Sequence, residues 1–250
     1  MNDWASALVS VAIVSLISFV GALTLWSGAR GLQVLVPLLI SLAVGALFGD
    51  ALVHLIPEAF AASTNVPLTA AYILFGVLIF YALEAFLHWH HEHRNQVANP
   101  VHPMAYINLL ADGLHNFVDG LVIGASYLAG APVGVATTLA VALHEIPQEL
   151  GDFGVLMRAG FTRRRALTMN FLTALTAVLG AIISLLIAGK IEGYAPTMLA
   201  ITAGGFIYFA GADLIPELHK EHRLPGSLIQ FVTVVAGMAL MYLLLLIEVE

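Results

Sequence analysis

The stretch "HNFVDG" at residues 115–120 places metal-binding side chains inside otherwise apolar sequence. His115 and Asp119 lie four residues apart, so on a helix they stack on one face, with Asn116 one step round the helix. Imidazole nitrogens and carboxylate or amide oxygens are ligands that suit divalent ions such as zinc, manganese or iron(II). The spacing therefore predicts one half of a divalent-metal site.

A second stretch, "HEIPQE" at residues 144–149, carries two further pairs with the same spacing. His144 pairs with Gln148, and Glu145 pairs with Glu149 on the adjoining face. Two antiparallel helices that each present such ligands can enclose a metal ion between them. We therefore predict that the 115–120 and 144–149 stretches form one site.

Many ionisable side chains fall inside segments long and apolar enough to cross a membrane. Each charged group at mid-bilayer costs about 2.5–3.5 kcal/mol, and such groups mark ion or substrate pathways by default. Lys and Arg are absent from these segments, so a bound cation is the missing positive charge. The alternative is a structural polar network between helices, which usually needs only one or two hydroxyls or amides. The groups are Asp50, His54, Glu58, Asp112, His115, Asp119, His144, Glu145, Glu149, Asp152, Asp213 and Glu217.

The composition predicts an all-α membrane protein with a single domain, 1–250. Of its 250 residues, 60% are hydrophobic and 10% are charged, whereas soluble domains carry about a quarter charged residues. The net charge of −7 argues against a nucleic-acid partner, and without cysteine any metal site must use nitrogen and oxygen ligands. Eight segments reach the roughly 20 residues that a spanning helix needs. They are 6–26, 33–60, 68–88, 104–129, 132–157, 166–189, 196–217 and 226–247.

The basic residues predict the orientation of these eight spans. Cytoplasmic loops collect Lys and Arg, so the loops that hold most of them should lie inside. That choice puts both termini outside and leaves only Lys190 on the outer side. The inner loops then hold Arg30, Arg94, Arg158, Arg163, Arg164, Arg165, Lys220 and Arg223.

The sequence also repeats itself in a way that predicts inverted symmetry. "LIPE" occurs at 55–58 and again at 214–217, at the ends of the second and seventh spans, which run in opposite directions. The 115–120 and 144–149 stretches form a second antiparallel pair. Inverted repeats are typical of secondary transporters, whose substrate sites lie near the midplane. We predict a 3+2+3 arrangement; the alternative is a chance match between hydrophobic helices.

Further polar residues suggest a route to the site. Asp50, His54 and Glu58 occupy three successive turns of the second span and form a polar ladder along a transport pathway. Asp213 and Glu217 either continue such a pathway or cap a helix end. Prolines beside these residues and beside the 144–149 pairs, namely Pro57, Pro147 and Pro216, each remove a backbone donor and should bend their helices.

The tract "HWHHEH" at 88–93 follows the third span, in the predicted cytoplasmic loop 89–103. Short histidine-rich tracts bind metal weakly. The tract is either a metal acceptor or a plain polar loop. Its histidines are His88, His90, His91 and His93.

With "GDALVHLIPEA" on the second span, "DLIPELH" on the seventh and the two central stretches between them, the chain resembles the ZIP family of divalent metal transporters. The resemblance covers nearly the whole chain. It implies that zinc passes into the cytosol, that the protein is a homodimer, and that one helix bundle moves against a scaffold. Manganese, iron and cadmium are further candidate substrates, and no catalytic cofactor is expected.

The resemblance also implies roles for individual residues. His115, Asp119, His144 and Gln148 would line the primary site, with Asn116, Glu145 and Glu149 forming or flanking a second one. His54 and Glu58 would belong to the route, which we extend to Asp50, Asp152, Asp213 and Glu217, and Asp112 would support the fourth-span ligands.

This chain departs from the family at two positions of the central site. Gln148 stands where the nearest branch has histidine, so affinity or selectivity should differ. The sixth span has Asn170, Thr173 and Thr176 but lacks the acid that bridges two metals in some members.

Two other functions remain open from the sequence. "HEIPQ" begins like the H-E-x-x-H motif of zinc hydrolases, although Gln148 takes the place of the second histidine and Pro147 distorts the helix. The other open function is that of a metal-responsive receptor that does not transport metal. Short loops and the absence of an Asn-x-Ser/Thr sequence favour a prokaryotic inner membrane, with lipid as the surrounding partner.

Overall fold

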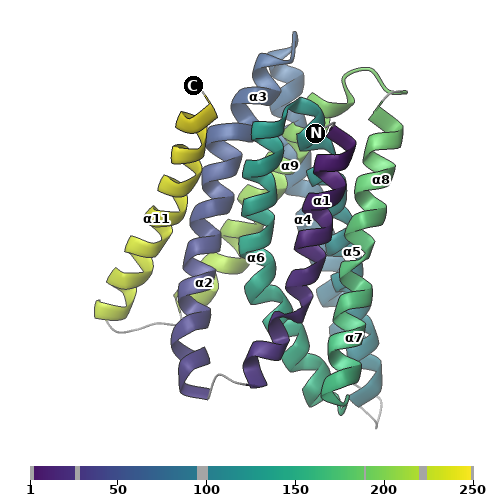
Figure 1. The fold of residues 1–250 in the computed structure, drawn as a ribbon, viewed down its shortest axis with the longest axis vertical. Helices are drawn as coiled ribbons and strands as arrows, with labels where there is room; N and C mark the ends of the chain where they lie inside the picture. The colour runs from purple at the N-terminus through teal and green to yellow at the C-terminus, as the bar shows by residue number, and fades with distance from the viewer. Residues whose placement is uncertain (1–2, 26–28, 95–100, 189, 220–223, 249–250) are drawn as a thin grey trace.

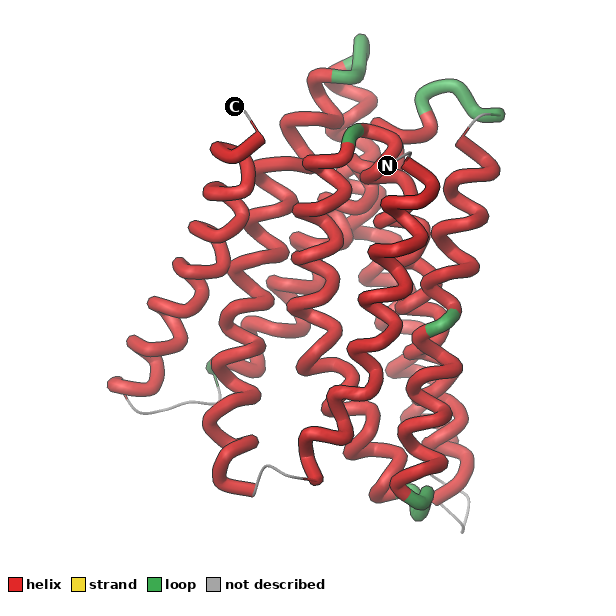
Figure 2. Tube along the Cα trace, viewed as in Figure 1, coloured by secondary structure: helices red, strands yellow, loops and turns green. Residues whose placement is uncertain are grey.

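The computed structural model describes residues 3–25, 29–94, 101–188, 190–219 and 224–248. Within these ranges the regular structure is helical, and the helices form one bundle (Figures 1 and 2). In chain order the elements are α1 (Asp3–Ile17), the 3₁₀-helix η1 (Ser18–Leu25), α2 (Ala29–Asp50), the π-helix η2 (Ala51–Leu55), α3 (Ile56–Ala61), α4 (Val66–Arg94), α5 (Val101–Ala129), α6 (Ala131–Arg158), α7 (Arg163–Ala174), α8 (Thr176–Ala188), α9 (Tyr194–Tyr208), the π-helix η3 (Phe209–Leu214), α10 (Ile215–Leu218) and α11 (Leu224–Glu248).

Five helical segments among the described residues are long and apolar enough to cross a membrane. They are Asp3–Ala22, Leu35–Ala61, Arg163–Ala188, Tyr194–Leu218 and Leu224–Leu246. The described apolar part of α4, Val66–Ala82, is shorter. The helices α5 and α6 are not among the five segments because they are less apolar. These last two carry the central pairs of polar residues, which lower hydropathy without preventing a helix from lying among others.

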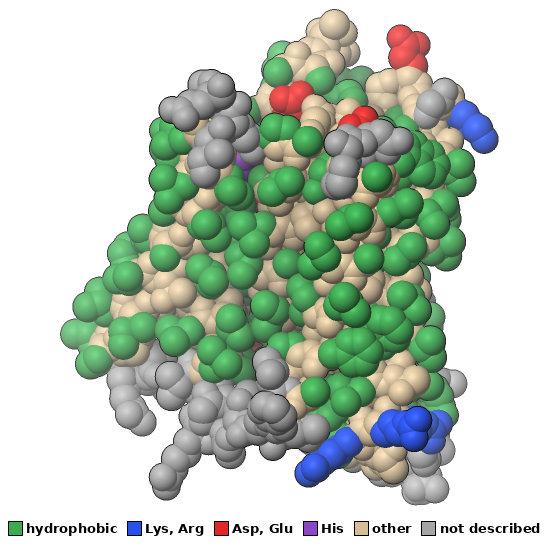
Figure 3. Space-filling model, viewed as in Figure 1, with side chains coloured by type: hydrophobic (Ala, Val, Ile, Leu, Met, Phe, Trp, Pro, Cys, Tyr) green, Lys and Arg blue, Asp and Glu red, His purple; other side chains and the backbone are tan. Residues whose placement is uncertain are grey.

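The surface matches a bundle surrounded by hydrocarbon. Large apolar side chains are exposed along its length, among them Leu74 and Leu78 on α4 and Phe231 and Leu243 on α11. Figure 3 shows hydrophobic side chains covering the middle of the visible face, with charged side chains at its two ends. In water such a surface would be unfavourable, so the protein is an integral membrane protein.

The two ends of the chain lie at the same end of the bundle (Figure 1). At the opposite end α7 begins with Arg163, Arg164 and Arg165, which are all exposed. Lys190 follows α8 at the end that holds the termini. The described basic side chains are therefore distributed unequally between the two ends (Figure 3).

Three pairs of helices cross at glycines, where their backbones touch. A Cβ atom added at any of these six glycines would lie 1.9–2.4 Å from a backbone carbonyl oxygen of the facing helix. Only glycine permits this approach, which gives close van der Waals packing within a bilayer. The pairs are Gly45 with Gly237 (α2 and α11), Gly76 with Gly204 (α4 and α9), and Gly120 with Gly180 (α5 and α8).

Both copies of Leu-Ile-Pro-Glu follow a π-helix. Pro57 and Pro216 lie in the first turns of α3 and α10, directly after η2 and η3. Because proline has no N–H, it cannot continue the α-helical ladder, and the chain takes a wider turn before it. Gly45 and Gly204 each lie ten residues before the leucine of their copy. The two copies therefore share a local conformation as well as a sequence.

The structure differs from the predicted element bounds in two places. The predicted loop 89–103 begins as helix, because α4 continues to Arg94 through a stretch that contains no proline or glycine. The predicted span 166–189 is broken at Leu175, between α7 and α8. Near this break the Thr173 hydroxyl oxygen lies 3.1 Å from the Met169 carbonyl oxygen and 2.8 Å from that of Asn170, and such side-chain contacts with the backbone bend helices.

Candidate metal centre

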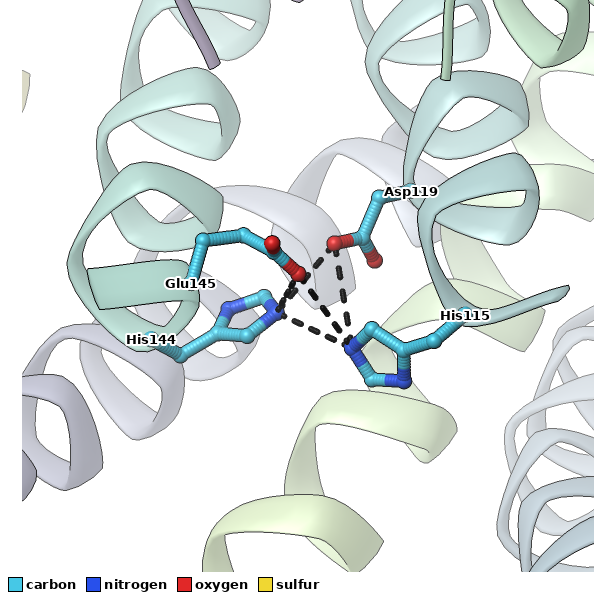
Figure 4. A group of neighbouring side chains, drawn as sticks. All are labelled: His115, Asp119, His144 and Glu145. Atoms are coloured by element: carbon cyan, nitrogen blue, oxygen red, sulfur yellow. Dashed lines mark hydrogen bonds and ion pairs between the residues drawn. The ribbon is translucent and has the colours of Figure 1, made fainter. Parts of the chain in front are cut away.

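Four side chains from α5 and α6 converge in the interior of the bundle (Figure 4). His115 and Asp119 come from α5, and His144 and Glu145 come from α6. One ligand atom from each, the Nε2 of a histidine or a carboxylate oxygen, lies within 4.8 Å of the other three. We call these four residues the central cluster.

Local sequence places the two helices so that these side chains meet. Gly130 alone separates α5 from α6, and its φ of 145° lies where only glycine is relaxed. The resulting tight turn makes the helices antiparallel neighbours. His115 and Asp119 share one face of α5, as their spacing predicts.

The distances within the central cluster suit one metal ion. The His144 Nε2 lies 3.2 Å from an Asp119 oxygen and 3.3 Å from the His115 Nε2. The Glu145 oxygen lies 3.7 Å from the His115 Nε2 and 3.8 Å from the His144 Nε2. Four ligands at about 2.0–2.2 Å from a tetrahedral metal stand roughly 3.3–3.6 Å from one another. The four atoms therefore lie close to the corners of a zinc-sized coordination sphere.

Burial makes a cation the natural partner of this cluster. His144 and Glu145 are 1% exposed, and the His115 side chain, at 19%, is the most accessible. The Asp119 Oδ2 and the Glu145 Oε1 have no hydrogen-bond donor. A buried carboxylate without a partner is costly, and a divalent cation would balance both at once.

A backbone contact fixes the orientation of one imidazole. The Nδ1 of His144 lies 3.2 Å from the Ala140 carbonyl oxygen, which can only accept a hydrogen bond. Nδ1 must therefore carry the proton, and the lone pair of Nε2 faces the cluster. A hydrogen bond from the other ring nitrogen in this way orients a histidine for metal binding.

A phenylalanine from η3 closes the cluster on its apolar side. The ring of Phe209 lies 5.2 Å from the His115 ring and 5.3 Å from the His144 ring, measured between centroids. Phe206 of α9 packs edge-on against His144 at 6.1 Å. The wider π-turn of η3 thus brings the apolar ring of Phe209 to this side of the cluster.

Asp112 of α5 and Gln148, Glu149 and Asp152 of α6 form a second layer, one to two turns nearer the basic end of the bundle. The Asn116 amide donates to the Asp112 carboxylate at 2.8 Å, and the Thr173 hydroxyl of α7 donates to the same group. Gln148 also lies beside Asp112. This predicted ligand thus contacts a carboxylate outside the central cluster, whereas Glu145 supplies a cluster oxygen.

The same layer contains two carboxylates held by asparagines. Asn170 of α7 donates to the Glu149 carboxylate at 2.8 Å, leaving the other oxygen of the fully buried Glu149 without a donor. Asn108 of α5 donates to Asp152 at 2.8 Å. Glu149 and Asp152 therefore lie on the side of the cluster that faces the basic end.

The residues predicted for the pathway in the two repeat copies are distributed differently. Asp50 and His54 are buried on α2 and η2, with the His54 Nδ1 3.4 Å from an Asp50 oxygen. Glu58 lies one turn further along, on α3, and is partly exposed. In the other copy Glu217 is exposed, whereas the side chain of Asp213 lies outside the described residues. The side chains of His88, His90, His91 and His93 also lie outside them, although their backbone belongs to α4.

Sequence reasoning missed several residues that shape this region. The sequence analysis noted Asn170 and Thr173 only because the sixth span lacks an acidic residue. In the structure both donate hydrogen bonds to carboxylates of the second layer. Their spacing of three residues, which puts both on one face of a helix, was the available signal. Nothing in the sequence pointed to Asn108 or Phe209, because apolar and single polar residues are common in such helices.

Comparison with known proteins gives an independent result. A family model described as "ZIP Zinc transporter" matches residues 2–105 and 89–245. The chain is 32% identical to "Zinc transporter zipt-7.1" of Caenorhabditis briggsae, over 84% of this chain and 71% of that protein. It is 36% identical to "Zinc transporter ZIP13" of Pongo abelii, over 82% and 65% respectively. A shorter match of 41% identity, to "Zinc transporter zipt-7.2" of Caenorhabditis elegans, covers 58% of this chain and 32% of that protein.

Proposed function

Because the chain belongs to the ZIP zinc transporter family, we propose that it carries a divalent metal ion across a membrane into the cytosol. The observation that carries this proposal is the central cluster, with two imidazoles and two carboxylates at the spacing of a single coordination sphere. Zinc is the substrate that this donor set fits best. The ion is cargo, so its ligands must also release it.

Alternating access is the proposed mechanism. Ligands on two neighbouring helices bind the ion, and movement of these helices relative to the rest of the bundle exposes the cluster to each side in turn. The second layer around Asp112, Glu149 and Asp152 would receive the ion on the cytosolic side, and Asp50, His54 and Glu58 would lead to the cluster from outside. Asp213 and Glu217 stay predicted members of the pathway.

Liposome uptake tests this function directly. Purified protein in liposomes that contain a zinc-sensitive dye should give saturable zinc influx, and manganese, iron(II) and cadmium should be compared beside it. Influx no faster than in protein-free liposomes would reject transport. The hydrolase alternative has no support from the family match, and an assay for peptide cleavage on the same sample separates the two.

Eight crossings in a 3+2+3 inverted repeat are part of the proposal. The support comes from the two π-helices at Leu-Ile-Pro-Glu, from Gly45 and Gly204 in the same register, and from the two glycine crossings, α2 with α11 and α4 with α9, that join the first half to the second. Two transport halves with opposite orientation would let one fold open to either side.

Cysteine labelling tests the proposed orientation. The natural chain has no cysteine, so a single introduced cysteine reports on its own position. In intact cells an impermeant maleimide should label Lys190→Cys and should label Arg164→Cys only after the membrane is opened. Both side chains are exposed at opposite ends of the bundle. The opposite pattern would invert the topology and place both termini inside.

The residue at position 148 should tune the choice of metal. A carboxamide oxygen is a neutral, weak ligand, whereas imidazole binds zinc strongly. We expect Gln148→His to lower the KM for zinc on the order of tenfold, the scale on which groups near a metal change its affinity. Manganese uptake, which depends on oxygen ligands, should change less. Equal changes for the two metals would mean that the side chain at position 148 contacts no transported ion.

Four further features remain predictions. They are the homodimer, the surrounding lipid as a partner, the metal-accepting role of the histidine tract and the location in a prokaryotic inner membrane. The matched relatives named above come from animals, so they do not favour a bacterial membrane over another. Cross-linking in native membranes and localisation of a tagged chain would test the first and the last of these.

A further inference from the structure

Outside the central cluster, Asp50 and His54 leave an unusual number of polar atoms without partners. Both oxygens of Asp50 and both ring nitrogens of His54 are buried and have no hydrogen bond. Asp50 is 0% exposed and His54 is 3% exposed. Beside them on α6 lies Thr137, also 0% exposed, whose hydroxyl faces the Asp50 carboxylate. Buried polar groups in proteins are normally satisfied, so this group needs a ligand.

The geometry of the pair suits a cation. The His54 Nδ1 lies 3.4 Å from the Asp50 Oδ1, close enough for an ion pair but with no hydrogen bond between them. Two ligands at about 2.1 Å from one tetrahedral ion stand roughly 3.4 Å apart. One divalent ion could therefore contact nitrogen and oxygen together and balance the carboxylate charge. The π-helix η2 carries His54, and π-turns inside helices often mark functional sites.

The pair lies on α2 and η2, apart from the central cluster, and its neighbour Thr137 gives its level along α6. Thr137 precedes His144 by seven residues of α6, which corresponds to about 10 Å along the helix axis. It lies toward the end of α6 next to Gly130, where the chain termini and Lys190 also lie (Figure 1). That end is the proposed outer side.

We propose that Asp50 and His54, with the Thr137 hydroxyl, form a second binding site for a divalent metal ion, on the outer side of the central cluster. This inference rests on the proposed transport function, because the site would hold the same cargo before it reaches His144 and Glu145. Two protein ligands and a hydroxyl bind more weakly than two imidazoles and two carboxylates. The outer site therefore releases its ion readily to the central cluster.

Equilibrium zinc binding to the full-length protein in lipid nanodiscs tests the outer site. The measured quantity is the number of zinc equivalents lost on substitution, since the histidine tract at 88–93 can add equivalents of its own. Asp50→Asn and His54→Gln keep the side-chain shape, and each should remove one weak equivalent. Leu52→Ala, at an exposed position of the same π-helix, should remove none.

A variant without the central cluster separates the two sites. His115→Ala with Glu145→Ala should lose the tight equivalent and keep the weak one, and adding Asp50→Asn should remove the weak one. In liposomes, Asp50→Asn should raise the KM for zinc several-fold while uptake continues. If Asp50→Asn and His54→Gln leave the zinc stoichiometry unchanged in folded protein, the outer site does not exist, and transport through the central cluster stands. Absence of uptake by the unaltered protein would instead reject the proposed function.

Discussion

Glu145→Ala and His115→Ala should each abolish zinc uptake in liposomes, with initial rates lower by roughly 100-fold or more. Each substitution removes one of four ligand atoms that lie within 4.8 Å of one another. The fold should survive, because Glu145 is 1% exposed and its Oε1 has no donor. A buried charge without a partner is itself costly, so its removal offsets the packing that Glu145→Ala loses. Uptake rates and melting temperatures in the same detergent-purified samples check both expectations.

Matched substitutions outside the cluster serve as controls. Glu192→Ala and His219→Ala remove the same side chains at exposed positions and should transport at the unaltered rate. Glu145→Gln keeps the shape of the side chain and loses its charge, so it should bind zinc more weakly while folding normally. Uptake by Glu145→Ala or His115→Ala at the level of these controls would remove the central cluster from the transport route.

The second large effect is expected where helices touch through glycine. A Cβ at Gly120 would lie 1.9 Å from the Ala177 carbonyl oxygen, and one at Gly180 would lie 2.1 Å from that of Phe117. Rigid backbone lies on both sides of these contacts, so α5 and α8 would have to separate. Overpacking of this kind costs about 3 kcal/mol. Gly120→Ala and Gly180→Ala should therefore lower the melting temperature and the yield of folded protein.

Gly151→Ala is the control for these substitutions. An added Cβ at Gly151 meets nothing within 4 Å, and alanine favours a helix over glycine by about 1 kcal/mol. This variant should be as stable as the natural chain or more so. Because Gly120 follows the cluster residue Asp119, Gly120→Ala should also lose uptake. Equal stability of Gly120→Ala, Gly180→Ala and Gly151→Ala would mean that these helices do not cross as closely as described.

The sequence was sufficient to predict which stretches of α5 and α6 carry the polar side chains that converge. Spacing of four residues put His115 and Asp119 on one face, and the absence of basic side chains nearby pointed to a cation. The predicted helix ranges contain the observed helices to within a few residues, apart from the break at Leu175 and the continuation of α4 to Arg94. These features depend on residues close together in sequence, so local physical rules suffice for them.

Contacts between distant residues required the tertiary structure. Helical spacing says which side chains share a face, but the rotation and crossing of two helices decide which faces meet. For this reason Glu145 joined the central cluster while Gln148 came to lie beside Asp112. The hydrogen bond from Asn170 to Glu149 joins residues 21 positions apart, and its geometry depends on how α6 and α7 pack.

The sequence by itself thus determined that polar side chains suited to metal binding recur at helical spacing on α5 and α6. Only the tertiary structure decided which of them converge, because convergence depends on glycine crossings such as Gly120 with Gly180 and on the π-turns of η2 and η3. Those features set helix separation and rotation through contacts made across the whole bundle. No local pattern of residue types encodes them.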